Sequence, residues 1–286
     1  MTTTSEKLVV ITPAKNEEEH IEKCIKSVLA QTYPVTLHLV VDDCSDDRTA
    51  QIAGKYPVKI ISSGLKKSVK QHGMRPHLVQ QVGIDKITEL VPDWQYLLLL
   101  DGDCWIPCTY CEDLIEEMNK DQKLAMVGAR YLQTPKGAEE SSSIHVRSAN
   151  HIIRRRFYDI CSRSGRDYAN LHGEMLLEKC AWINGWSSRT LPITAYAGRE
   201  TGVTVADPFK KGEYDYSLGM PFAILLLRLR KPSKRRILQV CGWIRARIRR
   251  RVQYFDERER ILLRRWYFEH LLKRIQFRPI PRKRWG

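Results

Sequence analysis

The segment Tyr96–Asp103, YLLLLDGD, places a continuous apolar run directly before two aspartates that flank one glycine. Such a run is typical of a strand buried on both faces, as in a parallel sheet. α/β proteins bind ligands at the edge formed by the carboxyl ends of these strands. The segment therefore predicts a strand over 96–100, with Asp101 and Asp103 as hard oxygen ligands for Mg²⁺ or Mn²⁺. For the tripeptide alone, a polar turn without function is the alternative.

Two further acidic clusters follow apolar runs nearer the N-terminus. Leu8–Thr12 (LVVIT) precedes a turn that contains Glu17, and Leu37–Val41 (LHLVV) precedes Asp42 and Asp43. Because the carboxyl ends of parallel strands lie at one edge of a sheet, we expect the three clusters to converge. One acidic turn is typical of a solvated loop, whereas three at one edge indicate a site.

The remaining periodicities complete an α/β pattern. Strands are also expected over 58–62 and 124–131, and helices over 16–30 with Asn16 as N-cap, 48–56, 76–90, 141–158 and 171–186. Strands that alternate with single helices predict a mainly parallel central sheet with helices on both faces. The run Arg154–Arg156 is expected on a solvated helix face.

Composition separates the chain into two parts. Its 286 residues, 43% of them apolar, suffice for one α/β domain with an appendage. The net charge of +15 resides in residues 231–286, where 19 Lys and Arg oppose 4 Asp and Glu. No apolar run approaches the ~18 residues that span a bilayer, and the first residues lack the apolar core of a signal peptide, so an intracellular protein is expected. Neither a GxGxxG nor a GxxxxGK[ST] motif occurs, which argues against both phosphate-binding loops.

Three segments resemble the successive motifs of family 2 glycosyltransferases: 9–19 (VVITPAKNEEE), 37–47 (LHLVVDDCSDD) and 97–103 (LLLLDGD). These are inverting enzymes with the GT-A nucleotide-diphospho-sugar transferase fold, and the resemblance covers roughly residues 7–190. It implies a catalytic domain over 1–218, with a donor half at about 7–103 and an acceptor half at about 104–218. Residues 219–286 then form a separate helical extension.

The resemblance also implies roles for individual residues. The donor would be a UDP- or GDP-linked sugar, and Mn²⁺ or Mg²⁺ would bridge its diphosphate. Asp103 would ligate the metal, and Asp101 would contact the ribose or a metal-bound water. Pro13, Ala14 and Glu17 would line the nucleotide pocket, and Asp43 or its neighbour Asp42 would accept a hydrogen bond from the base.

The catalytic base is the point at which the chain departs from the family. Inverting transfer needs a carboxylate that deprotonates the acceptor hydroxyl, and many members carry Glu-Asp shortly after a turn resembling Gly185-Trp186. Here residues 190–194 (TLPIT) occupy that stretch, and no acid lies between Glu178 and Glu200. The candidates are Glu174, Glu200 and Asp207, although a helix-start glutamate at position 174 is equally explained by the helix dipole. A degenerate relative that binds the donor and transfers poorly is the alternative.

The C-terminal extension is basic and amphipathic. Apolar residues recur at helical spacing on one arc, arginines fill the other, and Asp256 with Glu259 forms a capping pair for a second helix. The apolar set is Ile237, Cys241, Ile244, Ile248, Val252 and Phe255. This pattern predicts that 231–286 hold the protein on an anionic membrane, on the cytoplasmic face, where the acceptor is a lipid-linked or other glycan. Packing on the catalytic domain, a homodimer, and nucleic-acid binding are the alternatives; the last would leave the acidic clusters unexplained.

Overall fold

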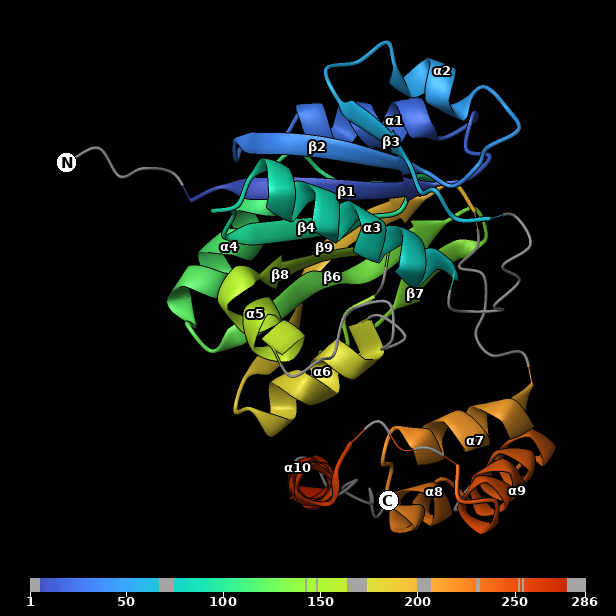
Figure 1. Cartoon of the computed structure of the whole chain (residues 1–286). Helices are drawn as coiled ribbons and strands as arrows, with labels where there is room; N and C mark the ends of the chain where they lie inside the picture. The colour runs from blue at the N-terminus through green and yellow to red at the C-terminus, as the bar shows by residue number, and fades with distance from the viewer. Residues whose placement is uncertain are drawn as a thin grey trace, which may run out of the picture. The chain divides into compact units, whose positions relative to one another are not determined.

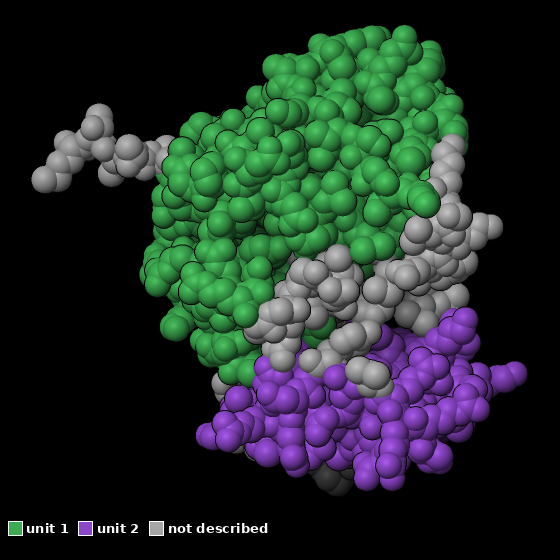
Figure 2. Space-filling model, in the orientation of Figure 1, with its two compact units in different colours: residues 1–203 green, residues 204–286 purple. Residues whose placement is uncertain are grey.

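The computed structural model describes residues 6–66, 75–141, 143–147, 149–163, 174–199, 207–229, 232–251, 253 and 255–276. The chain divides into two compact units, residues 1–203 and 204–286 (Figure 2). The division lies before the expected boundary at 218, because the helix Pro208–Ser217 packs against Lys234–Ile248 of the second unit.

The described part of the first unit contains one nine-stranded sheet (Figure 1). Its strands are β1 (Leu8–Ala14), β2 (Val35–Asp42), β3 (Lys59–Ser62), β4 (Tyr96–Leu100), β5 (Cys104–Trp105), β6 (Leu124–Thr134), β7 (Gly137–Glu140), β8 (Asn150–Arg154) and β9 (Ser187–Ala197). The order is β3-β2-β1-β4-β8-β6-β9-β5, with β7 paired to β6. The run β3-β2-β1-β4 is parallel as predicted, whereas β8 is antiparallel to both of its neighbours. The α/β class is confirmed, and the sheet as a whole is mixed.

Helices cover both faces of this sheet. They are α1 (Ile21–Leu29), α2 (Thr49–Ala53), α3 (Arg75–Leu90), α4 (Tyr110–Lys120), α5 (Arg155–Arg163) and α6 (Glu174–Ile183). Val10 of β1 belongs to the core formed with α1 and α4. The next residue, Ile11, faces α3, because successive strand side chains point to opposite faces. A Cβ at Gly83 would lie 2.8 Å from Ile11 Cγ2, so only glycine allows α3 to approach this closely.

The segment 141–158 was predicted to be helical, and this prediction is wrong for the described residues before Arg155, where α5 begins. Residues 150 to 154 are a strand instead. These residues form β8, which is buried along its whole length and pairs with β4. Arg154 is likewise buried instead of solvated. Its Nε donates to the Leu124 carbonyl at 3.1 Å, and its Nη2 donates to the Met118 carbonyl. Backbone carbonyls thus compensate for the burial of a guanidinium at the end of β8.

The second unit contains α7 (Pro208–Ser217), α8 (Phe222–Arg228), α9 (Lys234–Ile248) and α10 (Glu257–Gln276). Two glycines allow α7 and α9 to touch: a Cβ at Gly212 would lie 1.8 Å from the Gln239 carbonyl oxygen, and one at Gly242 would lie 1.9 Å from the Phe209 carbonyl oxygen. No helix within the described ranges combines the length and apolarity needed to cross a bilayer.

The capping pair predicted for the last helix is confirmed. The Glu259 amide donates to Asp256 Oδ1 at 2.9 Å, and the Asp256 amide donates to Glu259 Oε2 at 3.0 Å. This reciprocal arrangement is a capping box, and it satisfies two amides that the helix itself leaves without acceptors.

Candidate active site

Three acidic loops meet at the carboxyl edge of the parallel strands, as the sequence predicts. β1 and β2 pair through Ala14 and Asp42, and the Asp43 amide donates to the Ala14 carbonyl at 2.8 Å. The loop after β4 joins them, because the Gly102 amide donates to the Pro13 carbonyl at 3.2 Å. The structure therefore brings the predicted nucleotide-pocket and metal residues together at one edge.

The glycine of Asp101-Gly102-Asp103 permits this contact. A Cβ at position 102 would lie 3.1 Å from Glu17 Cγ and 3.2 Å from the Pro13 carbonyl oxygen. Both distances are shorter than ordinary van der Waals contact, so a larger residue would push the turn away from the first loop. The turn thus carries two carboxylates and still packs against Glu17.

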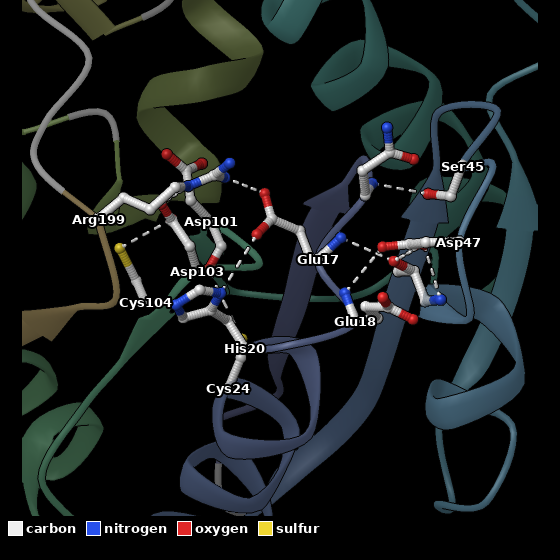
Figure 3. A network of polar contacts seen from close by, with 12 residues as sticks. Glu17, Glu18, His20, Cys24, Ser45, Asp47, Asp101, Asp103, Cys104 and Arg199 are labelled. Atoms are coloured by element: carbon white, nitrogen blue, oxygen red, sulfur yellow. Dashed lines mark hydrogen bonds and ion pairs between the residues drawn. The ribbon is translucent and has the colours of Figure 1, made fainter.

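Arg199 forms ion pairs with two of the three carboxylates, Glu17 and Asp103 (Figure 3). Its Nε donates to Asp103 Oδ2 at 3.0 Å, and its Nη2 donates to Glu17 Oε1. The preceding Gly198 amide donates to the Asp103 carbonyl at 2.7 Å and fixes the chain beside the turn. The sequence analysis did not identify Arg199, which lies just after β9 and far along the chain from the motifs it contacts.

One guanidinium does not compensate for three carboxylates. Burial raises the pKa of Glu17 to about 7, although Arg199 partly opposes this shift, and Asp103 adds to it. Burial, together with the charges of Asp103 and Glu17, raises the pKa of Asp101 to about 7. Glu17 Oε2 is buried without a hydrogen-bond partner. The site therefore favours a further cation over further negative charge.

The donor set fits a divalent cation that shares its ligands with a phosphate. No three acidic, cysteine or histidine side chains of the described residues are placed to hold a metal by themselves. Mg²⁺ is commonly held by one or two carboxylates plus the phosphate oxygens of a substrate. The carboxylate oxygens of Glu17, Asp101 and Asp103 at the carboxyl edge of the sheet, one of which accepts no hydrogen bond, match that mode of binding.

The second motif is organised around an ion pair. Arg75 Nε donates to Asp43 Oδ2 at 2.6 Å, Arg75 Nη2 donates to Asp43 Oδ1 at 2.6 Å, and the Ser63 hydroxyl donates to Asp43 Oδ1 at 2.8 Å. Burial alone would raise the pKa of Asp43, but the hydrogen bonds from Arg75 and Ser63 outweigh it and lower the pKa. Asp42 Oδ1, by contrast, is buried without a donor. The two aspartates therefore differ in their capacity to accept a new hydrogen bond.

The first loop differs from prediction in its turn. Asn16 was expected to cap a helix, but it has φ +54° and α1 begins at Ile21. The Asn16 side chain instead accepts from the Asp46 amide at 2.8 Å, and the Glu18 amide donates to Asp47 Oδ2 at 3.0 Å. Left-handed backbone is tolerated by asparagine, and here it joins the first acidic loop to the second.

The predicted base candidates lie on separate segments of the chain. Glu174 is the first residue of α6, and Glu200 lies outside the described residues. Asp207 is the N-cap of α7, where its Oδ1 accepts from the Phe209 amide at 2.9 Å. The residues 190–194, which occupy the stretch that is acidic in many relatives, belong to β9.

Two other groups were missed by the sequence analysis. Glu178 is buried in α6 and accepts from the Val146 amide at 2.7 Å, and its Oε2 lies 2.9 Å from His145 Nδ1. Trp105 follows the acidic turn and stacks on Tyr196 with ring centroids 6.1 Å apart. Two sequence signals could have indicated these groups. Glu178 is an acidic residue within an otherwise apolar helical segment, and Trp105 is an aromatic residue two positions after Asp103.

The model of Glycosyl transferase family 2 matches residues 9–168. Glycosyltransferase AglE of Haloferax volcanii is 34% identical over 106 residues, which are 36% of this chain and 33% of that protein. The chain thus matches about a third of this relative's length.

Two solved structures share the fold. TarS 1-349 of S. aureus aligns with a TM-score of 0.53 and 17% identity over 85% of this chain and 72% of that chain. The mannosyltransferase PcManGT of Pyrobaculum calidifontis, in complex with GDP-Man and Mn²⁺, aligns with a TM-score of 0.52 and 13% identity over 96% of this chain and 83% of that chain.

Proposed function

Because this chain belongs to glycosyl transferase family 2 and is a glycosyltransferase, we propose that it carries out metal-dependent, inverting transfer of a sugar from a nucleotide-diphospho-sugar to a hydroxyl acceptor. The observation that carries this proposal is the group of three carboxylates, Glu17, Asp101 and Asp103, that Arg199 only partly neutralises. A nucleoside diphosphate bound with a divalent cation would complete the charge balance at this edge.

The donor is proposed to be UDP- or GDP-linked. TarS has been solved with UDP-GlcNAc, and PcManGT with GDP-Man and Mn²⁺. In this chain Pro13, Ala14 and Glu17 would line the nucleotide pocket. Either Asp43, held by Arg75, or Asp42, with its unpaired Oδ1, would accept the hydrogen bond from the base.

Asp103 and Asp101 would hold the metal, which when bound neutralises charge on the leaving nucleoside diphosphate. Arg199 would then move away from Asp103, because a divalent cation bound to the same carboxylate would repel the guanidinium. A guanidinium released beside the site is suited to contact the diphosphate oxygens. Arg199 thus has a proposed place both before and after the donor binds.

The acceptor is proposed to be a lipid-linked or other glycan at an anionic membrane surface, reached from the cytoplasmic face. The support is the concentration of charge in residues 231–286 together with exposed apolar residues on α9 and α10. Glu174, Glu200 and Asp207 remain the proposed bases for deprotonating the acceptor hydroxyl. A degenerate enzyme, a homodimer through the second unit and nucleic-acid binding are the competing proposals.

The metal assignment is tested with the Asp103→Ala variant. Calorimetric titration of UDP and GDP, with and without Mn²⁺, should show metal-dependent binding in the parent and none in the variant, since alanine cannot replace an anionic ligand. Asp85→Ala, which removes an exposed carboxylate from α3, is the matched control and should bind like the parent. Unchanged metal-dependent affinity in Asp103→Ala would refute the assignment.

A further inference from the structure

The second unit contains a cavity of about 520 Å³ that the proposed sugar transfer does not use. Tyr216, Phe222 and Trp243 supply an aromatic part of its lining, and Arg247, Arg260 and Arg264 supply a cationic part. Trp243 is buried, whereas Arg247 and Arg264 are exposed. The lining therefore changes from apolar to positively charged toward solvent.

The aromatic part is held in place by its own contacts. The Trp243 indole N–H donates to the Met220 carbonyl at 3.0 Å. The Trp243 ring meets Tyr216 edge-on with centroids 5.3 Å apart, and it lies 5.0 Å from Phe222. Because the indole N–H is already satisfied, this surface can contact an apolar group without leaving a buried donor unpaired.

The three arginines of the cavity lack acidic partners among the described residues, and no acidic residue lines the cavity. Arg260 Nη1 contacts only neutral oxygens, those of the Gln253 side chain and the Phe255 carbonyl.

Some arginines outside the cavity are paired. Arg251 lies 3.2 Å and Arg245 lies 3.9 Å from Glu213, and Arg265 lies 2.8 Å from Glu269. Others, such as Arg249 and Arg250, have no ion pair among the described residues but are exposed and do not line this cavity. The cavity is therefore distinguished by three guanidinium groups without ion pairs that line one hollow beside an aromatic surface.

Exposed apolar side chains lie on the same helices as the cavity residues. On α9, Ile244 and Ile248 flank Arg247 in sequence, and on α10, Ile261 follows Arg260. On α9 the buried residues include Val240, Trp243 and Ala246, so the part of the predicted apolar stripe that lies on this helix is outside the core, whereas Phe255, beyond the end of the helix, is buried. Among the described residues of this unit, the exposed large apolar side chains are Leu226, Leu227, Ile237, Ile244, Ile248, Ile261, Leu262 and Phe268.

We propose that this cavity binds the phosphate group of a membrane lipid. The guanidinium groups of Arg247, Arg260 and Arg264 would contact the phosphate oxygens, for which their planar donors are suited. The exposed apolar residues would enter the boundary between headgroups and acyl chains. This deepens the proposed membrane attachment from general electrostatic attraction to a defined headgroup site, and it does not depend on the donor chemistry.

The test is sedimentation of the full chain with phosphatidylcholine vesicles and with two anionic mixtures, which contain phosphatidylserine or phosphatidic acid and are matched to each other in surface potential. The phosphate of phosphatidic acid is a terminal monoester, whereas the phosphate of phosphatidylserine is masked by its ester to serine. The cavity predicts tighter binding to phosphatidic acid. Equal binding to both anionic vesicles would overturn the proposal.

Two double variants that remove the same charge separate the cavity from the surface. Arg260→Gln with Arg264→Gln should lose the preference for phosphatidic acid, by on the order of tenfold in affinity for a lost charged hydrogen bond. Arg258→Gln with Arg265→Gln, on the same helix outside the cavity, should keep it. Equal losses in both pairs would overturn the proposal in favour of unspecific attraction. If the first pair does not fold by circular dichroism, Arg247→Gln replaces it with the same expectation.

Titration with soluble phosphate compounds distinguishes a lipid headgroup site from a site for free phosphate. Glycerol phosphate and inorganic phosphate, titrated into the full chain, should bind much more weakly than phosphatidic acid vesicles, since they lack acyl chains. Binding of either as tight as that of the vesicles would make this a site for free phosphate and overturn the lipid assignment. Asp103→Ala should retain vesicle binding, and the cavity variants should retain donor binding, so each proposal can fail by itself.

Discussion

Asp101 occupies a position in which ionisation costs free energy. Burial and the neighbouring charges of Asp103 and Glu17 raise its pKa from 3.8 to about 7. Between these values the folded chain binds more protons at Asp101 than the unfolded chain does. The contribution of Asp101 to stability is therefore full below pH about 4 and is lost as the pH rises through about 7.

Asp101→Asn should consequently gain stability relative to the parent as the pH rises. In urea denaturation without metal, the difference in unfolding free energy should grow between pH 5 and pH 8 by about 2–3 kcal/mol, since about two pH units separate pH 5 from the folded pKa and each corresponds to ~1.4 kcal/mol. Asp85→Asn, on an exposed helix face, should show no such trend. Parallel pH curves for Asp101→Asn and the parent would mean that Asp101 is not perturbed in the folded chain.

Arg199 and a divalent cation should compete for the same carboxylate. Without nucleotide, Arg199→Gln is expected to bind Mn²⁺ more tightly than the parent, on the order of tenfold for one charged hydrogen bond that no longer has to be broken. With saturating Mn²⁺ the same variant should bind UDP or GDP more weakly, because it lacks the Arg199 guanidinium that is proposed to contact the diphosphate. Calorimetry measures both affinities.

Arg48→Gln provides the control for Arg199, since it removes the same charge from a residue whose partner is Glu18, in the adjacent loop. It should change neither affinity by more than about twofold, because exposed ion pairs contribute little. If both variants raise Mn²⁺ affinity equally, the effect is long-range electrostatics and not competition at Asp103.

Among the elements, those with a clean periodicity were predictable. β1, β2, β4 and β6 are apolar runs, and Glu17, Asp101 and Asp103 could be placed because each comes shortly after such a run. β8 was not predicted because three of its five residues, Asn150, His151 and Arg154, are polar, and buried strands are usually apolar. Residues far along the chain compensate part of this burial: the Tyr110 hydroxyl donates to Asn150 Oδ1 at 3.3 Å, and Arg154 donates to the carbonyls of residues 118 and 124.

The arginines of the site could not be predicted for a related reason. Arg75 and Arg199 lie in stretches that resemble solvated loops. Their proximity to Asp43 and Asp103 depends on how β9 and α3 are placed, which is tertiary information. The buried face of α9 could not be predicted either. This face contains Gly242, which packs against the Phe209 backbone, whereas the most regular apolar stripe of the sequence lies on another face.

The contact between α7 and α9 should be intolerant of added volume. Gly242→Ala places a methyl group where the Phe209 carbonyl oxygen lies, so the helices must separate. We expect a loss of about 1–3 kcal/mol or more in the stability of the second unit, as for an overpacked core. Cys241→Ala, at the exposed neighbouring position, should be nearly neutral in the same thermal unfolding experiment. Equal stability of the two variants would show that α7 and α9 do not touch at this point.

The proposed bases are separable by conservative variants. If Glu174 is the base, Glu174→Gln should lower kcat by ~10² or more and leave donor affinity nearly unchanged. Asp207→Asn keeps the helix cap, since asparagine caps as well as aspartate, so a loss of kcat without a loss of stability would identify Asp207 instead. The same signature in Glu200→Gln would place the base there. If the parent also fails to transfer sugar, the degenerate-enzyme alternative gains.

At the scale of the whole molecule, the two proposed activities occupy different units. The carboxylates belong to residues 1–203, whereas the excess charge of +15 lies within residues 231–286. The boundary between the units determines where the chain can be cut. A cut after Arg230 would leave α7 and α8 in place but remove α9, so Gly212 would lose the helix it touches and Leu225 would lose its contact with Trp243.

Truncation after residue 203 should therefore behave differently from truncation after residue 230. The fragment 1–203 is expected to bind UDP or GDP with Mn²⁺ like the full chain and to lose sedimentation with anionic vesicles. The fragment 1–230 is expected to aggregate, because it exposes the apolar faces of α7 and α8.

Raising the salt concentration should weaken vesicle binding by the full chain, since attraction to the surface decays over a Debye length of ~8 Å at physiological ionic strength. A folded 1–203 fragment that cannot bind nucleotide would show that residues 204–286 contribute to the donor site. Salt-sensitive retention of the full chain on DNA or RNA, without vesicle binding, would favour the nucleic-acid alternative.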